Sequence, residues 1–399
     1  MKKRGLSLFL ALALCLTLLP AAAFANGEPE TSTPHTHYLC GNGETCSHVG
    51  GHNETDKTTF ATAITQDENG YVWVGDGTQE QPYQCVLSEG TYYLATDLAL
   101  EAPSNTQFGS IQIMENVTFC LNGHTITVKA NREAFKITKS VDPPSPTLTL
   151  SDCQGGGKIT HDSSFLGNGV NLSENCNFIM YGGSITGNTT VWSSGGVYVQ
   201  DSGKFYMHGG EISGNNASSN SGSSGGGVHI GSGAFTMTGG MISGNSASNN
   251  GGGVHISSGS TFTMAGGTIS GNNAENGGGV YANGSCTVSG AVQITGNKQG
   301  TSAGNVYLRS GKTITIGTNH LSSDASIGVT TQNPPANEDI AIATGANLDD
   351  KQYFHSDTDE NYLFYVTSDG TICMTAANAH GHPICGASCQ DGSSHKSET

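Results

Sequence analysis

The chain has 399 residues and a formal net charge of −17, and charged residues make up 12% of it. Ordinary globular domains contain about 25% charged residues, and an acidic excess excludes the many basic contacts through which proteins bind nucleic acid. Glycine accounts for 58 residues, but the glycines recur at fixed places, which argues for an ordered repeat rather than a disordered chain.

Residues 1–25 have the pattern of a secretory signal peptide. Residues 2–4 are basic, residues 6–19 are apolar, and residues 21–25 are mostly small. The apolar run is shorter than the roughly 20 residues of a membrane-spanning helix. We therefore expect cleavage before Asn26 and a secreted or cell-surface protein that does not insert into the membrane. The mature chain would carry 12 basic and 32 acidic residues, a net charge of −20.

Two Cys/His-rich elements lie on either side of the central repeats. The first spans residues 26–60, and the second, which is truncated, spans residues 379–399. Thiolates and imidazoles at short spacing can hold Zn²⁺. In an exported protein the same cysteines can instead form local disulfides, or do neither. These alternatives stay open for His35, His37, Cys40, Cys46, His48 and His52, and for His380, His382, Cys385, Cys389 and His395. Because the second copy stops at Thr399, we expect the chain to be part of a longer repeat protein.

Glycine-rich repeats dominate residues 118–320. The motif G-G-x-I-[ST]-G-N recurs with isoleucines 27, 30, 27 and 25 residues apart, from Ile185 to Ile294. The strings Phe-x-Met and Gly-Val-x-Ile share this period, so each repeat holds three short alternating segments. Alternation puts every second side chain on one face. The pattern predicts an all-β chain that folds as a right-handed parallel β-helix, with three strands per coil and about nine or ten coils.

Less regular coils are expected on both sides of the repeats. Residues 61–117 should form an irregular N-terminal cap and the first coils, and residues 321–378 the last coils and a β-hairpin cap. Cys120 and Cys153 each precede a coil isoleucine by six residues, so we expect them to stack, bonded or not. The asparagines that end each motif should form a hydrogen-bonded ladder: Asn188, Asn215, Asn245, Asn272 and Asn297.

The motifs G-G-x-I-[ST]-G-N and G-G-G-V-x-I resemble those of the pectin-lyase-like β-helix superfamily, especially repeat-rich, adhesin-like surface proteins. The flanking segments, such as residues 121–126, look like those of surface proteins of Gram-positive gut bacteria. The resemblance covers about residues 90–375. It implies a fold rather than an activity, since one fold hosts many functions.

Two outward columns are candidate surfaces. The middle residue of Gly-Val-x-Ile predicts an aromatic stripe that could grip a sugar, a protein or a metal, or could merely stabilise the sheet: Tyr198, His229, His255, Tyr281 and Tyr307. The Phe-x-Met strands predict a threonine array at Thr236, Thr263 and Thr287, which Ile179 and Tyr206 interrupt. We favour β-propensity over ice binding as the reason for these threonines.

Catalytic signatures are weak. Polysaccharide-acting enzymes need clustered carboxylates, whereas Glu174, Asp201, Glu211 and Glu275 share no evident strand position. The expected function is therefore a non-catalytic, adhesin-like binding or spacer module, with a host or microbial glycan or a surface protein as partner. The alternative is a divergent polysaccharide lyase or hydrolase. No cofactor is expected, apart from Zn²⁺ if the Cys/His elements bind it.

Overall fold

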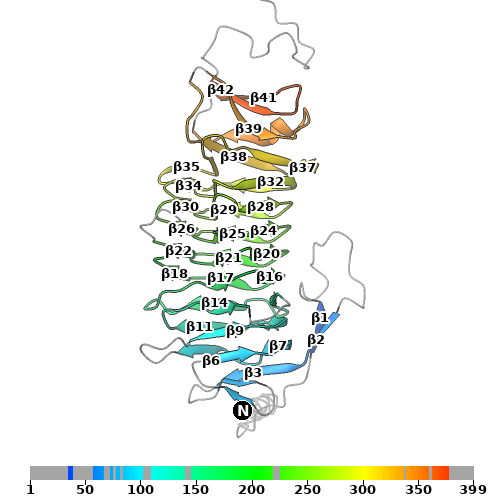
Figure 1. Cartoon of the computed structure of the whole chain (residues 1–399), viewed down its shortest axis with the longest axis vertical. Coiled ribbons are helices and arrows are strands. Elements are labelled where there is room, and N and C mark those ends of the chain that lie inside the picture. The colour runs from blue at the N-terminus through cyan, green and yellow to red at the C-terminus, as the bar shows by residue number, and fades with distance from the viewer. Residues whose placement is uncertain are drawn as a thin grey trace, which may run out of the picture. The chain divides into compact units, whose positions relative to one another are not determined.

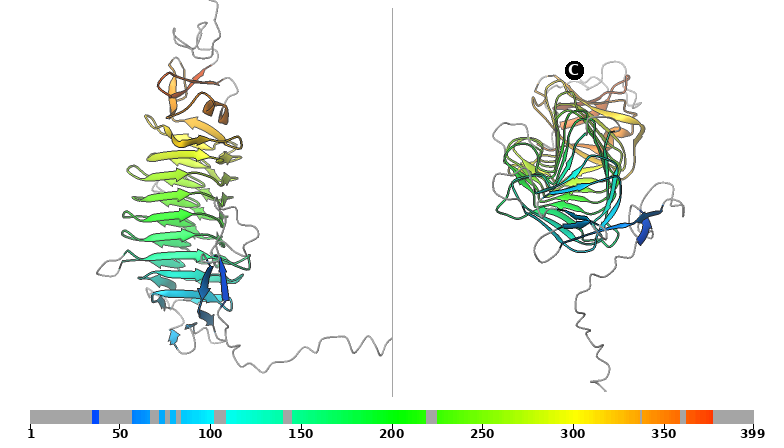
Figure 2. Two further views of the ribbon diagram at one scale, coloured as in Figure 1. Left: turned by 90° about the vertical axis from the view of Figure 1, so that its right-hand side faces the viewer. Right: turned by 60° about the horizontal axis from the view of Figure 1, so that its bottom comes forward.

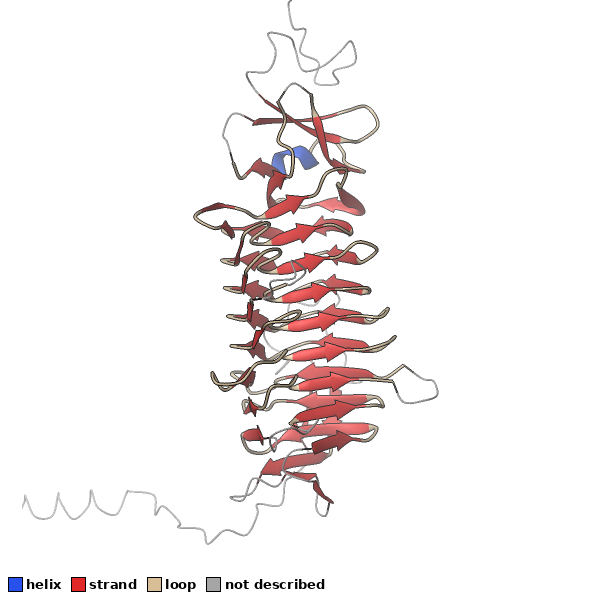
Figure 3. Ribbon diagram, turned by 60° about the vertical axis from the view of Figure 1, so that its left-hand side comes forward, coloured by secondary structure: helices blue, strands red, loops and turns tan. Residues whose placement is uncertain are grey.

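The computed structural model describes residues 35–38, 57–66, 72–74, 78–80, 84–101, 109–139, 145–218, 225–336, 338–358 and 362–376. The predicted signal peptide lies outside these ranges, as does the second Cys/His-rich element. Within the described ranges the chain is almost entirely β-strand, and it forms a parallel β-helix of about ten coils (Figures 1 and 3). The predicted fold class is confirmed.

A central coil contains the three predicted strands and a fourth, shorter one. In one such coil these are β20 (Lys204–Met207), β21 (Glu211–Ser213), β22 (Asn216–Ala217) and β23 (Val228–Ile230). The short strand β22 follows the ladder residue Asn215 directly. Two residues are too few to show an alternating pattern, so the sequence did not reveal this strand.

Strands of successive coils pair in parallel and build four rows, which are stacked in Figure 2. The Phe row contains β3 (Thr62–Gln66), β7 (Gly90–Leu94), β10 (Val117–Cys120), β13 (Thr147–Ser151), β16 (Asn177–Met180), β20, β24 (Ala234–Met237), β28 (Thr261–Met264), β32 (Ser285–Gly290), β37 (Ile314–Leu321) and β39 (Ile340–Thr344). The Ile row contains β8 (Leu98–Glu101), β11 (Thr125–Lys129), β14 (Lys158–His161), β17 (Ser184–Thr186), β21, β25 (Met241–Ser243), β29 (Thr268–Ser270) and β33 (Gln293–Thr295).

The other two rows complete each coil. The short row contains β18 (Thr189–Thr190), β22, β26 (Ser246–Ala247), β30 (Asn273–Ala274) and β34 (Lys298–Gln299), which pairs antiparallel with β35 (Ser302–Ala303). The Val row contains β6 (Gln84–Leu87), β9 (Ser110–Ile113), β12 (Phe135–Ile137), β15 (Val170–Leu172), β19 (Val197–Val199), β23, β27 (Val254–Ile256), β31 (Val280–Ala282) and β36 (Val306–Leu308). The Ile and Val rows meet in β38 (Ser326–Thr331), which pairs with both β33 and β36, and then with β40 (Phe354–Ser356).

Antiparallel strands end the Phe row at both sides. At the N-terminal side, β3 pairs with β4 (Val72–Val74), and β4 pairs with β5 (Thr78–Glu80). At the C-terminal side, β39 pairs with β42 (Ile372–Ala376), which forms the expected hairpin with β41 (Tyr362–Val366). A single short 3₁₀ helix, η2 (Asp350–Tyr353), is present among the described residues. The added antiparallel strands cover the polar edges of the last parallel strands.

The core consists of identical side chains stacked through the interior. The rings of Phe178, Phe205, Phe235 and Phe262 are fully buried and stack with centroids 4.9, 4.5 and 5.0 Å apart. Their spacing follows the distance between paired strands. Because an inward phenylalanine lies on the next one, the register of the Phe row is fixed by burial, since a slip by one residue would turn the rings to solvent.

The Gly-Gly-Gly runs before β23, β27 and β31 are explained by close packing. A Cβ atom on Gly226 would lie 2.3 Å from the Gly252 carbonyl oxygen and 2.5 Å from that of Ser246. A Cβ on Gly252 would lie 2.5 Å from the carbonyl oxygens of both Asn273 and Gly278. Here the short row closes against the start of the Val row, and only glycine fits.

The five predicted ladder asparagines form a continuous buried chain of hydrogen bonds. In its central part Asn215 donates to Asn245 Oδ1 through both its backbone N–H, at 3.0 Å, and its side-chain amide, at 2.9 Å. The second amide hydrogen of Asn245 is donated to the Ile212 carbonyl at 2.9 Å. The same bonds recur from Asn188 to Asn297. Each ladder residue after Asn188 thus accepts a backbone N–H inside the coil that would otherwise be buried without a partner.

Residues outside the repeat motif terminate the ladder. At one end, His161 Nδ1 lies 2.7 Å from Asn188 Oδ1. At the other end, Asn297 donates to Asn305 Oδ1 at 2.9 Å, and Asn305 donates to the two carboxylate oxygens of Asp357, each at 2.6 Å. Each ladder asparagine therefore donates its backbone N–H and one side-chain N–H toward the Asp357 end, where the carboxylate accepts two charge-assisted bonds.

We predict that Asn245→Ala lowers the free energy of unfolding by about 3 to 5 kcal/mol, because it leaves both Asn215 donors buried without an acceptor. Chemical denaturation followed by circular dichroism measures the change. The control Asn333→Ala, at an exposed position, should change stability by less than about 0.5 kcal/mol. Equal effects of the two substitutions would contradict a stabilising ladder.

Asp357 gives a second prediction. Burial raises the pKa of its carboxyl, although the bonds from Asn305 oppose the shift. A raised pKa adds stability below the ordinary pKa of aspartate, near pH 4, and this stability is lost as the pH rises through the folded value. Asp357→Asn can still accept both bonds, as every ladder asparagine does. Its stability should equal or exceed that of the wild type at pH 7 and lose this pH dependence, whereas Asp357→Ala should cost about 2 to 3 kcal/mol. Urea unfolding at pH 3 and pH 7 distinguishes the variants.

Candidate binding site at a corner of the coils

The predicted aromatic stripe exists as a column of stacked rings on the outer side of the Val row. Tyr198 stacks on His229 with centroids 5.0 Å apart, and His229 stacks on His255 at 4.7 Å. His255 meets Tyr281 edge to face at 5.0 Å, and Tyr281 stacks on Tyr307 at 5.5 Å. The alignment follows from the pairing of their strands.

The stripe is not open to solvent in its middle. His229 is 4% exposed and His255 is 3% exposed, so these two residues cannot grip a ligand in the described structure. Burial, followed by repulsion from His255, lowers the pKa of His229 to about 3. His229 Nε2 lies 3.1 Å from Ser257 Oγ. The sequence did not reveal the burial of these two histidines, because alternation shows which face of the sheet a residue takes but not what covers that face.

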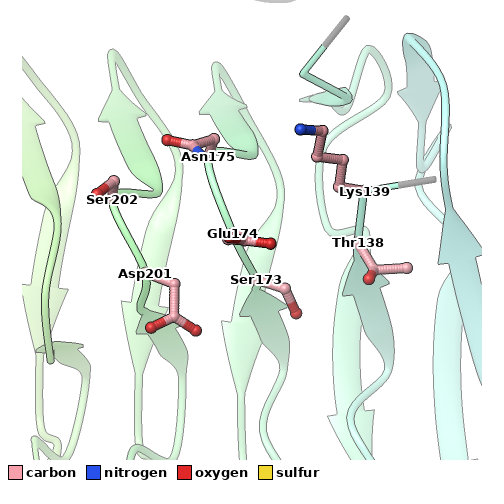
Figure 4. Close-up of a pocket in the computed structure, with 7 residues that line it drawn as sticks. All are labelled: Thr138, Lys139, Ser173, Glu174, Asn175, Asp201 and Ser202. Carbon is pink, nitrogen blue, oxygen red and sulfur yellow. The ribbon is translucent and has the colours of Figure 1, made fainter. Parts of the chain in front are cut away.

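A pocket of about 470 Å³ lies at the corner where Val-row strands turn into Phe-row strands (Figure 4). Three successive turns form it, those after β12, β15 and β19. Its lining is polar: Thr138, Lys139, Ser173, Glu174, Asn175, Asp201 and Ser202.

The charged residues of this pocket occupy equivalent positions. Lys139, Glu174 and Asp201 each lie two residues after the last residue of a Val-row strand, and those last residues pair in register. The three side chains therefore follow one another from coil to coil, as Figure 4 shows, and all three are exposed. Glu174 and Asp201 share no strand position, as expected from the sequence, but they do share a turn position, which the sequence analysis did not consider.

Left-handed backbone at non-glycine residues is concentrated at this corner, although Asn122 and His320 also have positive φ angles. Asn175, Asp201 and Ser202 have φ angles of 56°, 50° and 66°, a left-handed conformation that favours glycine. In later coils the corresponding turns use glycine, as at Gly259 and Gly311, with φ of 82° and 74°. Side chains in this conformation carry a cost in energy, and such costs concentrate at functional sites. The corner is the best candidate for a binding site.

Hydrogen bonds hold the corner in place. Asn175 N–H donates to the Asp201 carbonyl at 2.9 Å, and Asp201 N–H donates to Ser232 Oγ at 2.8 Å. Beside the pocket, Gln200 donates to Asn171 Oδ1 at 2.9 Å. The turns are therefore bonded to one another along the stack, and the exposed side chains project from a fixed backbone.

The threonine column is longer than the sequence analysis predicted. Strand pairing aligns Ile179 and Tyr206 with eight threonines in one outward column of the Phe row: Thr91, Thr118, Thr149, Thr236, Thr263, Thr287, Thr315 and Thr344. The two larger side chains split it into runs of three and five. β-propensity remains a sufficient reason for these threonines.

The predicted Zn²⁺ or disulfide elements are not described. His35 and His37 lie in β1 (His35–Tyr38), which pairs antiparallel with β2 (Lys57–Phe60), but their side chains lie outside the described set. The remaining candidates lie outside it entirely: Cys40, Cys46, His48, His52, His380, His382, Cys385, Cys389 and His395. Among the residues that are described, no group of three His, Cys, Asp or Glu side chains could hold a metal ion. No helix in the same residues is long and apolar enough to cross a membrane.

The fold and the corner define the chain as a parallel β-helix with a polar surface pocket. Comparison with protein-family models, with curated proteins and with solved structures gives no match.

The pKa of His229 predicts a pH effect on stability. A histidine whose folded pKa is lowered stabilises the fold above its unfolded pKa of about 6.5, and this stability is lost as the pH falls toward the folded value. We expect wild-type stability to fall between pH 6.5 and 3 with a component of about 1.4 kcal/mol per pH unit that His229→Phe lacks. Urea unfolding from pH 7 to 3.5 tests this. Parallel pH profiles of the two proteins would show that the ring is solvated.

Proposed function

We propose that the chain is an exported, non-catalytic module that binds a glycan at the corner pocket. The observation that carries the proposal is the set of side chains fixed there: two carboxylates, an ammonium group, an amide and three hydroxyls. Sugar hydroxyls both donate and accept hydrogen bonds, so they pair with carboxylates as acceptors and with amide or ammonium groups as donors. Because we expect the chain to be exported, the glycan would belong to a host or to a microbe.

Three features support a binding role. The pocket lies on the outside of the coils, where a long polymer can reach it without entering a cavity. The half-buried ring of Tyr198 lies in the strand that leads into it, and an aromatic face can stack on a sugar ring. The left-handed Asn175 and Ser202 retain side chains at the turn position where the later coils have Gly259 and Gly311.

A glycan array followed by calorimetry tests the site. We expect Asn175→Gly and Ser202→Gly to weaken binding at least tenfold while each raises stability by up to about 1 kcal/mol, because glycine removes the backbone strain. A matched control is Ser258→Ala, in the equivalent turn of a later coil, which should change neither quantity. Unchanged affinity in both glycine variants would place the ligand elsewhere.

A second function, hydrolysis or lyase cleavage of a polysaccharide, is favoured by one observation. Glu174 and Asp201 line the same pocket on adjacent coils, and paired carboxylates are the usual requirement for glycoside hydrolysis.

Assays for reducing sugars and for unsaturated products separate the two functions. Binding without turnover supports the module. Turnover that Glu174→Gln or Asp201→Asn abolishes would establish the enzyme and overturn the non-catalytic proposal.

A further inference from the structure

A small second core lies outside the main one, on the outer face of the Phe row. It contains Phe60 at the end of β2, Ala63, Tyr93 of β7, Cys120 of β10 and Cys153. The ring of Phe60 is fully buried and Cys153 is 8% exposed. The chain that leads from β2 into β3 thus covers two cysteines that belong to successive coils.

The two thiols are in contact. Cys120 pairs in register with Ser151, and Cys153 lies two residues further along the chain. The Sγ atoms are 3.4 Å apart, and Cys153 Sγ lies 3.3 Å from Asn122 Oδ1. A disulfide needs an S–S distance of about 2.05 Å, so the sulfurs must approach by little more than 1 Å.

The backbone around both cysteines is held in place. The Asp152 carboxylate accepts bonds from the Gly123 N–H at 2.7 Å and from the Gly157 N–H at 2.8 Å. One carboxylate therefore joins the turn after Cys120 to the turn after Cys153. This fixes the two coils at the spacing that brings the thiols together, before any covalent bond is made.

We propose that Cys120 and Cys153 form a disulfide bond in the exported protein and so join two N-terminal coils. Each thiol loses its proton, and the two sulfurs together lose two electrons. The electrons pass to a protein or small-molecule disulfide of the extracytoplasmic space, which leaves as two thiols after a mixed-disulfide intermediate. The bond is independent of the glycan-binding role, and its absence would leave that role untouched.

The order of events follows from burial. The pKa of the Cys120 thiol is raised, because it donates a hydrogen bond to Cys153 and is desolvated. Exchange needs the thiolate. The bond therefore forms during folding, before Phe60 covers the pair, and the folded disulfide is protected from reductants.

By contrast, Cys286 points into the main core and pairs in register with Phe262 of the neighbouring coil. Burial raises the pKa of the Cys286 thiol to about 12. It serves as an internal control and should stay reduced.

The test is a tryptic map of the mature chain, made in an oxidising compartment and alkylated before digestion without reductant. Cleavage at lysine gives a peptide of residues 140–158, with Cys153 alone, and one of residues 58–129, with Cys85 and Cys120. We expect the two peptides to be joined, with a mass two hydrogens below their sum. The link should vanish in Cys120→Ala and persist in Cys85→Ala, and Cys286 should be recovered as an unlinked cysteine.

Two results would overturn the proposal: residues 140–158 recovered unlinked from the wild type, or a link that persists in Cys120→Ala. The double variant C120A/C153A keeps small apolar side chains at both positions and is expected to fold. Its thermal midpoint should lie several degrees below that of the oxidised wild type. The tryptic map decides whether the bond exists, and the two midpoints measure how much the bond stabilises the coils.

Discussion

The architecture depends on one requirement: no backbone amide inside the coils can be left without a partner. At the turns after β17, β21, β25 and β29 the chain bends sharply, and the backbone N–H of the asparagine there points along the stack instead of into a sheet. An asparagine in the next coil supplies the acceptor, as Asn245 does for Asn215. Each asparagine is both acceptor and donor, so the hydrogen bonds continue from coil to coil. They fix the register of each coil of the ladder on the next one.

Much of the sequence pattern follows from that ladder. The glycine before each asparagine takes a positive φ, as at Gly244, with φ of 61°, so that the side chain turns inward. The glycine runs after it lie so close to the short row that a Cβ on Gly226 has no room. With these turns fixed, the ring of Phe235 stacks on the ring of Phe262. The proposed binding site lies at a corner of the coils, where the repeat varies.

The sequence predicted what the repeat determines and missed what it does not. The period of isoleucine, phenylalanine and asparagine gave the coils, the rows and the ladder. His161, Asn305 and Asp357, which terminate the ladder, belong to no repeat and gave no signal. The burial of His229 depends on its surroundings in space, which strand alternation does not encode. Glu174 and Asp201 each lie two residues after a strand end, and those ends, Leu172 and Val199, pair in register. The sequence could therefore have aligned them, but only strand positions were compared.

Hydrogen exchange of the ladder amides tests whether the asparagine ladder holds the coils. Residues in tight turns usually exchange their backbone hydrogens quickly, whereas the N–H groups of Asn188, Asn215, Asn245 and Asn272 lie in buried bonds to side-chain oxygens. Exchange read by mass spectrometry with residue-level fragmentation should find these four among the slowest amides of the chain. Exchange as fast as that of the exposed residues Ser258 and Asn333 would contradict the ladder and the register that it sets.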